Sequence, residues 1–396
     1  MAEDPGNEID ILRDAVGSGD WDTALPILRR KALDAADTAL HWSNLAAAQR
    51  AAGQESCAAL KRAIALDPDV PAYLNDLGAG DSSGTTAAER LLVLDPLHGP
   101  AALMSALRAF GDEQRRRGFR ILRRLRLSEP GSLEATFILG QFLDLAGRTE
   151  AAIRLYRAAL CIAPEDPMGV RRDLARHGIA PVQEAYSSTY VKRVFDGYAK
   201  NFDAHLTGRL KYSAPETLRL LGLACGILSE EHQAPRAVDL GCGTGLAGAA
   251  FRSYCTELTG IDMSPEMLRV AEEKQIYHRL VEDDAVAALA REDMPYDVAI
   301  AADVSSYIGD LEPFFRAVSA RLHPGGGLLM TAHEPVDPGG DGIGIGLDGA
   351  HSHSLDYLER CAGNAGLALV EMRRGSMREE GGEPLATLFL ALVKRR

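Results

Sequence analysis

Three features that would each point to a function are scarce in this sequence. Basic residues are outnumbered, with 43 Lys and Arg against 56 Asp and Glu and a net charge of -13. Electrostatic binding to nucleic acid or to an anionic membrane is therefore not expected. No apolar run approaches the ~20 residues that a bilayer span needs. The six cysteines are scattered with no C-x-x-C pair, which indicates free thiols in a reducing compartment and no disulfide framework.

The remaining composition is that of a globular protein, with 46% hydrophobic and 25% charged residues. The acidic, polar start of the chain is not typical of a signal peptide, so we expect a cytoplasmic protein. At 396 residues, the chain suits two domains, each with its own core.

We expect residues 1–167 to form an all-α domain of tetratricopeptide-like repeats. Prolines punctuate its Ala- and Leu-rich helices at Pro68, Pro96, Pro130 and Pro164, and the last two intervals are 34 residues, the period of that repeat. In the last repeat, Gly140, Ala152 and Tyr156 are among the residues that fall at its packing positions. A superhelix of about four helix pairs would bind a protein or peptide partner on its concave face. The alternative is a module that is purely structural or that joins two copies of the chain into a homodimer.

The motif AVDLGCGTGLAG at 237–248 is the most informative stretch of the chain. Its alternating glycines are Gly241, Gly243 and Gly245. A strand that turns there into a helix presents backbone N–H groups, and glycine lets a ligand approach them closely. Dinucleotide-binding folds use similar loops. Asp239, just before the glycines, would repel a pyrophosphate and attract an ammonium or a sulfonium group.

A second acid, Asp262, ends the next expected strand, where it could hold two ribose hydroxyls. Together the two stretches resemble the S-adenosylmethionine (SAM) site of class I methyltransferases. This resemblance implies a Rossmann-like domain over 231–396, with Met263 on the adenine and Asp284, or Asp283 after a one-residue slip, at its amino group. The cofactor-binding residues implied in this domain are Asp239, Gly241, Cys242, Gly243, Gly245, Asp262, Met263, Asp283, Asp284, Ala285 and Asp303.

Strand and helix patterns alternate to the end of the chain, as a parallel sheet wrapped by helices requires. The seven strands are expected near 236–242, 257–263, 278–283, 296–304, 326–334, 367–375 and 385–394. No helix is predicted between the last two, so they form an antiparallel hairpin. That ending is typical of class I methyltransferases and not of dinucleotide-binding dehydrogenases. A ligand should lie at the carboxyl ends of the first strands.

Residues 168–230 are predicted to be a linker followed by leading helices of the catalytic domain. They contain F-D-G-Y-A-K-N-F-D-A-H-L from Phe195 to Leu206. This stretch resembles the segment before the cofactor domain in bacterial tetratricopeptide-containing class I SAM-dependent methyltransferases. The resemblance implies an aromatic hydroxyl near the SAM carboxylate, from Tyr198 or, second, Tyr190. His205 is a candidate general base, although a lone histidine is more often structural.

Catalytic candidates gather after the fourth and fifth strands. Methyl transfer needs mainly alignment and exclusion of water, and a base only when the acceptor must lose a proton. The candidates at the pocket mouth are Asp303, Tyr307, His333, His351 and His353. The glycine-rich stretch 338–349 suits a mobile lid. No third ligand accompanies the H-x-H pair, so no metal is expected. Ser354 could instead be the N-cap of the helix that follows.

The sequence therefore predicts a SAM-dependent methyltransferase that modifies an O, N or C nucleophile. Its acceptor could be a small molecule, a carrier-bound intermediate or a protein. No N-P-P-Y-like stretch follows the fourth strand, which disfavours an amide or nucleobase acceptor. The main alternative is a non-catalytic SAM-binding scaffold that works through its repeat array, and a dehydrogenase ranks third.

Overall fold

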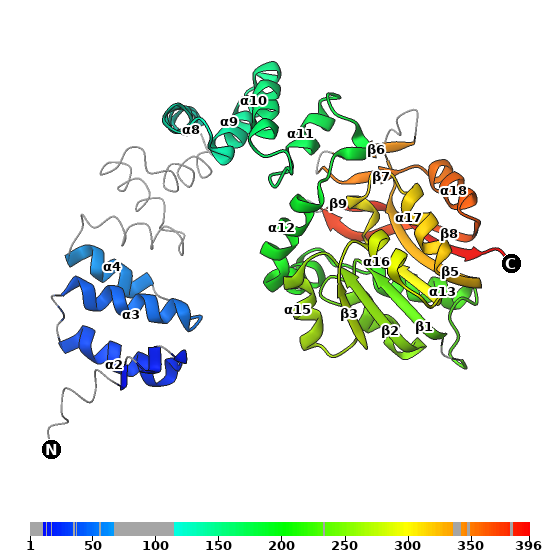
Figure 1. Ribbon diagram of the computed structural model, residues 1–396, viewed down its shortest axis with the longest axis horizontal. Coiled ribbons are helices and arrows are strands. Elements are labelled where there is room, and N and C mark those ends of the chain that lie inside the picture. The colour runs from blue at the N-terminus through cyan, green and yellow to red at the C-terminus, as the bar shows by residue number, and fades with distance from the viewer. Residues whose placement is uncertain are drawn as a thin grey trace. The chain divides into compact units, whose positions relative to one another are not determined.

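The computed structural model describes residues 11–66 and 115–396, apart from short gaps. The gaps are residues 13, 17, 35, 37, 55, 56, 233, 336–341, 347–348 and 381–382. The chain divides into two compact units, Met1–Ile162 and Ala163–Arg396 (Figure 1). The predicted repeat boundaries at Pro68 and Pro96 lie outside the described residues.

The described part of the first unit is helical. Its helices are α2 (Trp21–Asp34), α3 (Ala39–Ala51), α4 (Cys57–Leu66), α8 (Arg115–Ser128), α9 (Leu133–Leu145) and α10 (Thr149–Ile162). Helices α9 and α10 pack closely because Gly140 faces the ring of Tyr156, where a Cβ atom would lie 2.7 Å from the ring. Ala152 and Ala159 are fully buried on the same helix as Tyr156. This interlocking of small and large residues is the packing the repeat pattern requires, while the superhelix remains a prediction.

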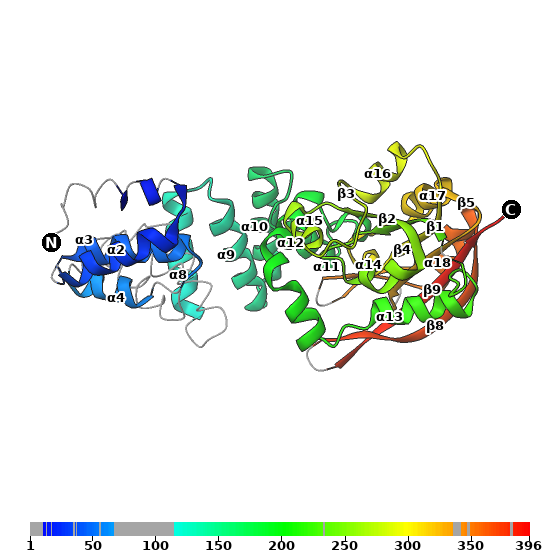
Figure 2. The same ribbon diagram turned by 90° about the horizontal axis from the view of Figure 1, so that it is seen from below.

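The second unit is built on a seven-stranded sheet. Its strands are β1 (Ala234–Leu240), β2 (Cys255–Asp262), β3 (Arg279–Glu282), β4 (Tyr296–Ala301), β5 (Leu322–His333), β8 (Leu367–Glu380) and β9 (Glu383–Lys394). They are arranged in the order β3-β2-β1-β4-β5-β9-β8, and Figure 2 shows the long strands β8 and β9 side by side. The four pairings from β3 to β5 are parallel, and β9 runs antiparallel to both β5 and β8. The predicted mostly parallel sheet and its terminal hairpin are confirmed.

Helices cover both faces of this sheet. They are α13 (Ala214–Ala224), α14 (Leu246–Phe251), α15 (Pro265–Glu273), α16 (Ala285–Arg291), α17 (Glu312–Ala320) and α18 (Leu355–Asn364). Buried residues of α16, α17 and α18 share one apolar core with the sheet, and those of α13 and α14 share another. None of the helices in the described part of the chain is long and apolar enough to cross a membrane.

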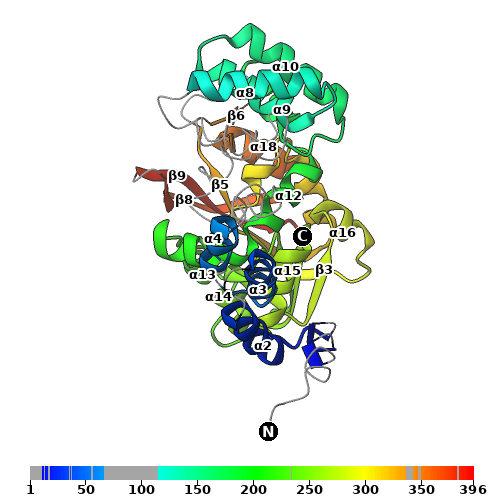
Figure 3. The ribbon, with the colours of Figure 1, turned by 90° about the vertical axis from the view of Figure 1, so that its left-hand side faces the viewer.

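A small hairpin accompanies the main sheet beside α18 (Figures 1 and 3). Its strands are β6 (Ile343–Ile345) and β7 (His351–His353), paired antiparallel. Part of the glycine-rich stretch that was expected to be a lid loop, residues 343–345, is therefore strand. Ser354 caps α18 by accepting the backbone N–H of Tyr357, so the N-cap interpretation of this serine is confirmed.

Ahead of the sheet lie several short helices. They are α11 (Val170–Arg176), η1 (Val182–Glu184), α12 (Ser188–Tyr198), η2 (Ala199–Asn201) and η3 (Ala204–Arg209). Ser187 caps α12 by accepting the N–H of Tyr190. Helix α12 packs against α15, so this leading segment lies over the carboxyl ends of the first strands.

Candidate active site

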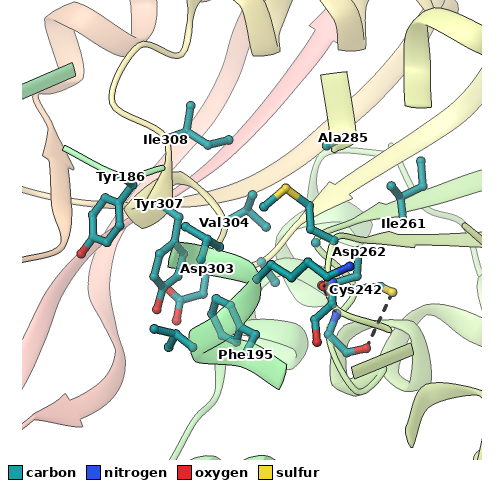
Figure 4. Close-up of a pocket in the computed structure, with 18 of the residues that line it drawn as sticks. Tyr186, Phe195, Cys242, Ile261, Asp262, Ala285, Asp303, Val304, Tyr307 and Ile308 are labelled. Carbon is teal, nitrogen blue, oxygen red and sulfur yellow. Dashed lines mark hydrogen bonds between the residues drawn. The ribbon is translucent and has the colours of Figure 1, made fainter. Parts of the chain in front are cut away.

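A cavity of about 580 Å³ lies at the carboxyl ends of β1, β2, β3 and β4 (Figure 4). Its walls come from the loops after these strands, from the segment around α12 and from β8. Eleven of the predicted site residues line it. They are Tyr198, Gly241, Cys242, Gly243, Asp262, Met263, Asp283, Asp284, Ala285, Asp303 and Tyr307.

The glycine turn after β1 forms the floor of the cavity. Gly241 and Gly243 have φ angles of 67° and 53°, in the left-handed region that favours glycine. A Cβ atom on Gly241 would also lie 2.5 Å from the side chain of Val304. Gly245, the third glycine of the motif, is the N-cap of α14 and does not line the cavity.

Asp262 ends β2 and is held in place by two backbone groups. Its Oδ2 accepts the N–H of Gly243 at 2.9 Å, and its Oδ1 accepts the N–H of Ser264 at 2.8 Å. Burial raises the pKa of this carboxyl, and the two hydrogen bonds oppose that shift. The carboxylate is thus oriented at the cavity wall, as a group that holds hydroxyls must be.

The neighbouring acids after β3 have different partners. Asp284 is the N-cap of α16, and its Oδ1 accepts the N–H groups of Val286 and Ala287 at 3.0 Å each. Asp283 pairs with Arg291 through Oδ2. Both acids line the cavity, so both predicted alternatives remain open.

Asp239 lies behind the glycine turn and is only 1% exposed. Its Oδ2 accepts the hydroxyl of Tyr277 at 2.6 Å, while its Oδ1 has no hydrogen-bond partner among the described residues. Burial raises the pKa of the Asp239 carboxyl to about 7, the bond from Tyr277 lowers it, and the nearby charge of Asp262 raises it. A buried acceptor atom of this kind fits a positively charged partner.

At the other end of the cavity, Asp303 follows β4 with a left-handed backbone (φ 61°). Its N–H donates to Thr331 Oγ1 at 2.8 Å, and its carboxylate contacts both Arg378 and His333, the latter at 3.2 Å from Nε2. Arg378 lies in β8 at a shift of register between β8 and β9. Strained backbone and bulges cluster at functional sites. Sequence reasoning missed Arg378, because the bulge that places it has no local signature.

Aromatic rings form the wall beside Asp303 (Figure 4). The ring of Tyr307 lies edge-on to Phe195 and Tyr186, with centroids 5.0 and 5.6 Å away. Tyr198 and Phe202 make a similar contact at 5.3 Å. Tyr186 was not predicted, and its hydroxyl donates to the carbonyl of Gly349 at 2.7 Å. These rings give this part of the cavity an apolar surface suited to a planar or apolar ligand.

Seven predicted site residues do not line the cavity: Asp239, Gly245, Tyr190, His205, His333, His351 and His353. Tyr190 packs on Gly169 and accepts a hydrogen bond from Arg172 at 2.7 Å. His205 contacts the hydroxyl of Tyr198 through Nδ1. His205 and His333 therefore touch lining residues, and could act on a ligand only through Tyr198 and Asp303.

The buried histidines of β7 support the wall. His351 Nε2 donates to the carbonyl of Val182 at 2.7 Å, and His353 Nε2 donates to that of Gly309 at 3.0 Å. Both side chains are fully buried, and burial lowers the pKa of His353 to about 4. The described residues contain no group of three or more His, Cys, Asp or Glu that could hold a metal ion.

The residues present fit the cofactor that the sequence predicted. A glycine turn allows close approach, Asp262 is oriented for hydroxyls, and the unpartnered Oδ1 of Asp239 fits an ammonium group. The strand order and the antiparallel β9, with an acid and a glycine turn after β1, define the architecture of a class I methyltransferase domain.

Comparison with known proteins supports this assignment. Residues 238–328 match the family model described as a methyltransferase domain. Over 154 residues, the chain is 30% identical to the ubiquinone biosynthesis O-methyltransferase of Cupriavidus pinatubonensis, covering 35% of this chain and 62% of that protein. It is 27% identical over 113 residues to the malonyl-[acyl-carrier protein] O-methyltransferase of Serratia marcescens, covering 28% and 42% of the two chains. The chain thus spans less than two thirds of these relatives.

A solved structure is also similar. The N-methyltransferase NodS from Bradyrhizobium japonicum, in complex with S-adenosylhomocysteine, aligns with 16% identity and a TM-score of 0.40, covering 52% of this chain and 98% of that one. The family model that matches residues 238–328 agrees with the predicted methyltransferase domain. The predicted family that joins such a domain to tetratricopeptide repeats remains a prediction.

Proposed function

We propose that the chain is a SAM-dependent methyltransferase acting on a hydroxyl group of a small acceptor with a planar or apolar body. The observation that carries the proposal is a single cavity with two chemically distinct ends. One end has the glycine turn and Asp262, and the other has Asp303 beside the rings of Phe195 and Tyr307. When bound, SAM supplies a methyl carbon made electrophilic by its sulfonium. The two curated relatives named above are both called O-methyltransferases, which favours oxygen as the acceptor atom.

The residues of the chain have separate tasks in this proposal. Asp262 holds the ribose, and the glycine turn lets the cofactor approach the backbone closely. The aromatic wall positions the acceptor and keeps water from the reacting centre. Asp303 is the carboxylate best placed to accept the proton of the acceptor hydroxyl, and its contacts with Arg378 and His333 hold it in place.

The first unit would serve recognition. We propose that its helical repeats bind a protein, a peptide or a carrier that presents the acceptor, or join two copies of the chain. The support is the close packing of α9 on α10 through Gly140 and Tyr156, which is the packing of tetratricopeptide units.

Titration calorimetry with S-adenosylhomocysteine would test cofactor binding. We expect Asp262→Ala to weaken affinity by about 100-fold, because it removes an oriented charged acceptor of hydrogen bonds. Asp293→Ala is the matched control, since Asp293 is exposed and does not line the cavity. Equal affinities of the two variants would contradict the proposed site.

Transfer of a labelled methyl group from SAM to a panel of phenols, amines and carboxylic acids would test the reaction. Labelling of phenols that falls at least tenfold in Asp303→Asn would support the proposal. Binding of SAM with no labelled product from any acceptor, including lysate proteins, would favour the alternative of a non-catalytic SAM-binding scaffold.

A further inference from the structure

A single tyrosine occupies a slot that three glycines create beneath the cofactor turn. Tyr277 lies between α15 and β3. A Cβ atom on Gly248 would lie 2.3 Å from its hydroxyl oxygen, one on Gly260 would lie 3.0 Å from its ring, and one on Gly245 would lie 3.1 Å away. These glycines belong to α14, β2 and the turn before α14, so three segments leave room for the tyrosine, and Gly260 also leaves room for Leu280 and Cys242.

The hydroxyl of Tyr277 lies among groups at and beneath the cofactor turn, with the Cys242 thiol and the backbone N–H of Gly248 beside it. This hydroxyl donates to Asp239 Oδ2 at 2.6 Å, and Asp239 Oδ1 has no hydrogen-bond partner among the described residues. Asp239 lies two residues before Gly241, directly behind the floor of the cavity. The other titratable groups that influence Asp239 or are influenced by it are Asp262, Cys242, Cys255 and Tyr212. None of these is a cation.

We propose that Tyr277 is a positioning residue, which holds the Asp239 carboxylate beneath the cofactor turn so that its charge attracts the positively charged amino group of the cofactor from behind the turn. On this assignment the third glycine of the motif, Gly245, makes room for the ring of Tyr277 and does not contact the ligand. Its absence from the cavity lining agrees with that role. The inference rests on the proposed function, because it concerns the cofactor of the same site.

The affinity of the site for the cofactor should depend on pH. Burial raises the pKa of Asp239 to about 7, so the carboxyl is neutral below that pH and charged above it. Affinity for a ligand with an ammonium group should therefore rise with pH through about 7. The hydrogen bond from Tyr277 lowers the pKa of Asp239, so its removal moves the rise in affinity to higher pH.

Calorimetry with two ligands at pH 6.5, 7.5 and 8.5 tests this inference. S-adenosylhomocysteine carries the amino group, and 5′-methylthioadenosine lacks the whole amino-acid part. For Tyr277→Phe, a shift of about one pH unit would weaken S-adenosylhomocysteine binding about eightfold at pH 6.5 and about threefold at pH 7.5, with near wild-type affinity at pH 8.5. Binding of 5′-methylthioadenosine should not change.

Tyr254→Phe is the matched control, because Tyr254 packs against the same apolar cluster and contacts Arg219 instead of Asp239. If Tyr277→Phe lost the same affinity at all three pH values, or the same affinity for both ligands, Tyr277 would only fill space. That result would overturn this inference and leave the proposed function standing. If the wild-type protein bound neither ligand at any pH, the proposed function would fall, and this inference with it.

Discussion

His353 gives the second unit a pH-dependent stability that can be calculated from the structure. Its ring is fully buried on β7, stacked on Tyr357 at 5.4 Å between centroids, and its Nε2 donates to the carbonyl of Gly309 at 3.0 Å. Burial is the main cause that lowers its pKa from 6.5 to about 4, and the neighbouring His351 and His333 lower it further. The folded protein therefore keeps His353 neutral across the physiological range.

The sign of the effect follows from which state binds the proton. Between pH 6.5 and pH 4 the unfolded chain is protonated at His353 and the folded chain is not. Stability is thus lost as pH falls through this window, and the loss is complete below about pH 4. From these two pKa values, we expect protonation of His353 in the unfolded chain to reduce the free energy of unfolding by about 2 kcal/mol when the pH falls from 7 to 5.

The comparison of wild type with His353→Asn isolates this contribution, because asparagine does not titrate. His351, whose pKa is also lowered, is retained in both proteins, so its effect cancels to first order. Both tryptophans, Trp21 and Trp42, lie in the first unit, so their fluorescence does not report on the second. Unfolding in urea should instead be followed by pulsed hydrogen exchange of peptides from β5 and β9.

When the pH falls from 7 to 5, the free energy of unfolding of the wild type should decrease by about 2 kcal/mol more than that of His353→Asn. The variant will be less stable at both pH values, because a buried hydrogen bond is lost. If the two proteins show the same pH dependence to within about 0.5 kcal/mol, the assignment of a neutral, structural His353 is wrong.

Three further substitutions have calculable outcomes. Gly140→Ala should destabilise α9–α10 by about 1–3 kcal/mol, seen as faster hydrogen exchange of their peptides, because the added Cβ meets Tyr156 at 2.7 Å; unchanged exchange would contradict the packing argument. Asp203 Oδ1 accepts the hydroxyl of Thr244 at 2.5 Å, so Asp203→Ala and Thr244→Val should show a coupling of about 1 kcal/mol in the free energy of unfolding, and additive losses would refute it. Arg378→Met should lower the midpoint of urea unfolding by the equivalent of about 3 kcal/mol, and replacing its aspartate partner with asparagine as well should recover most of the loss.

Several features of the site could be predicted from sequence because their physical causes are local. The glycines of the turn after β1 need left-handed backbone that other residues rarely adopt, so their spacing marks the turn. Asp262 follows a run of strand-forming residues, which fixes its place at a strand end. The absence of a helix between β8 and β9 indicated the hairpin in the same way. Ser354 was recognisable as an N-cap candidate from its own type and its place before a helix.

Pairings between distant side chains could not be predicted. The contact of Asp303 with Arg378 joins residues 75 apart through a bulge in β8, and that of Tyr277 with Asp239 joins residues 38 apart. His353 resembled a catalytic group until its burial was known. Each of these outcomes depends on register, bulges and packing density, which are properties of the assembled sheet.

The sequence by itself therefore determined the order of the elements, the position of the glycine turn and the acid that follows β2. Backbone preferences and hydrophobic periodicity act over a few residues, and they leave a readable pattern. Only the tertiary structure decided which candidates line the cavity and which support it from behind. Whether a candidate lines the cavity depends on the distances between segments. A side chain one layer deeper in the core is buried and contacts other residues of the same chain instead of a ligand.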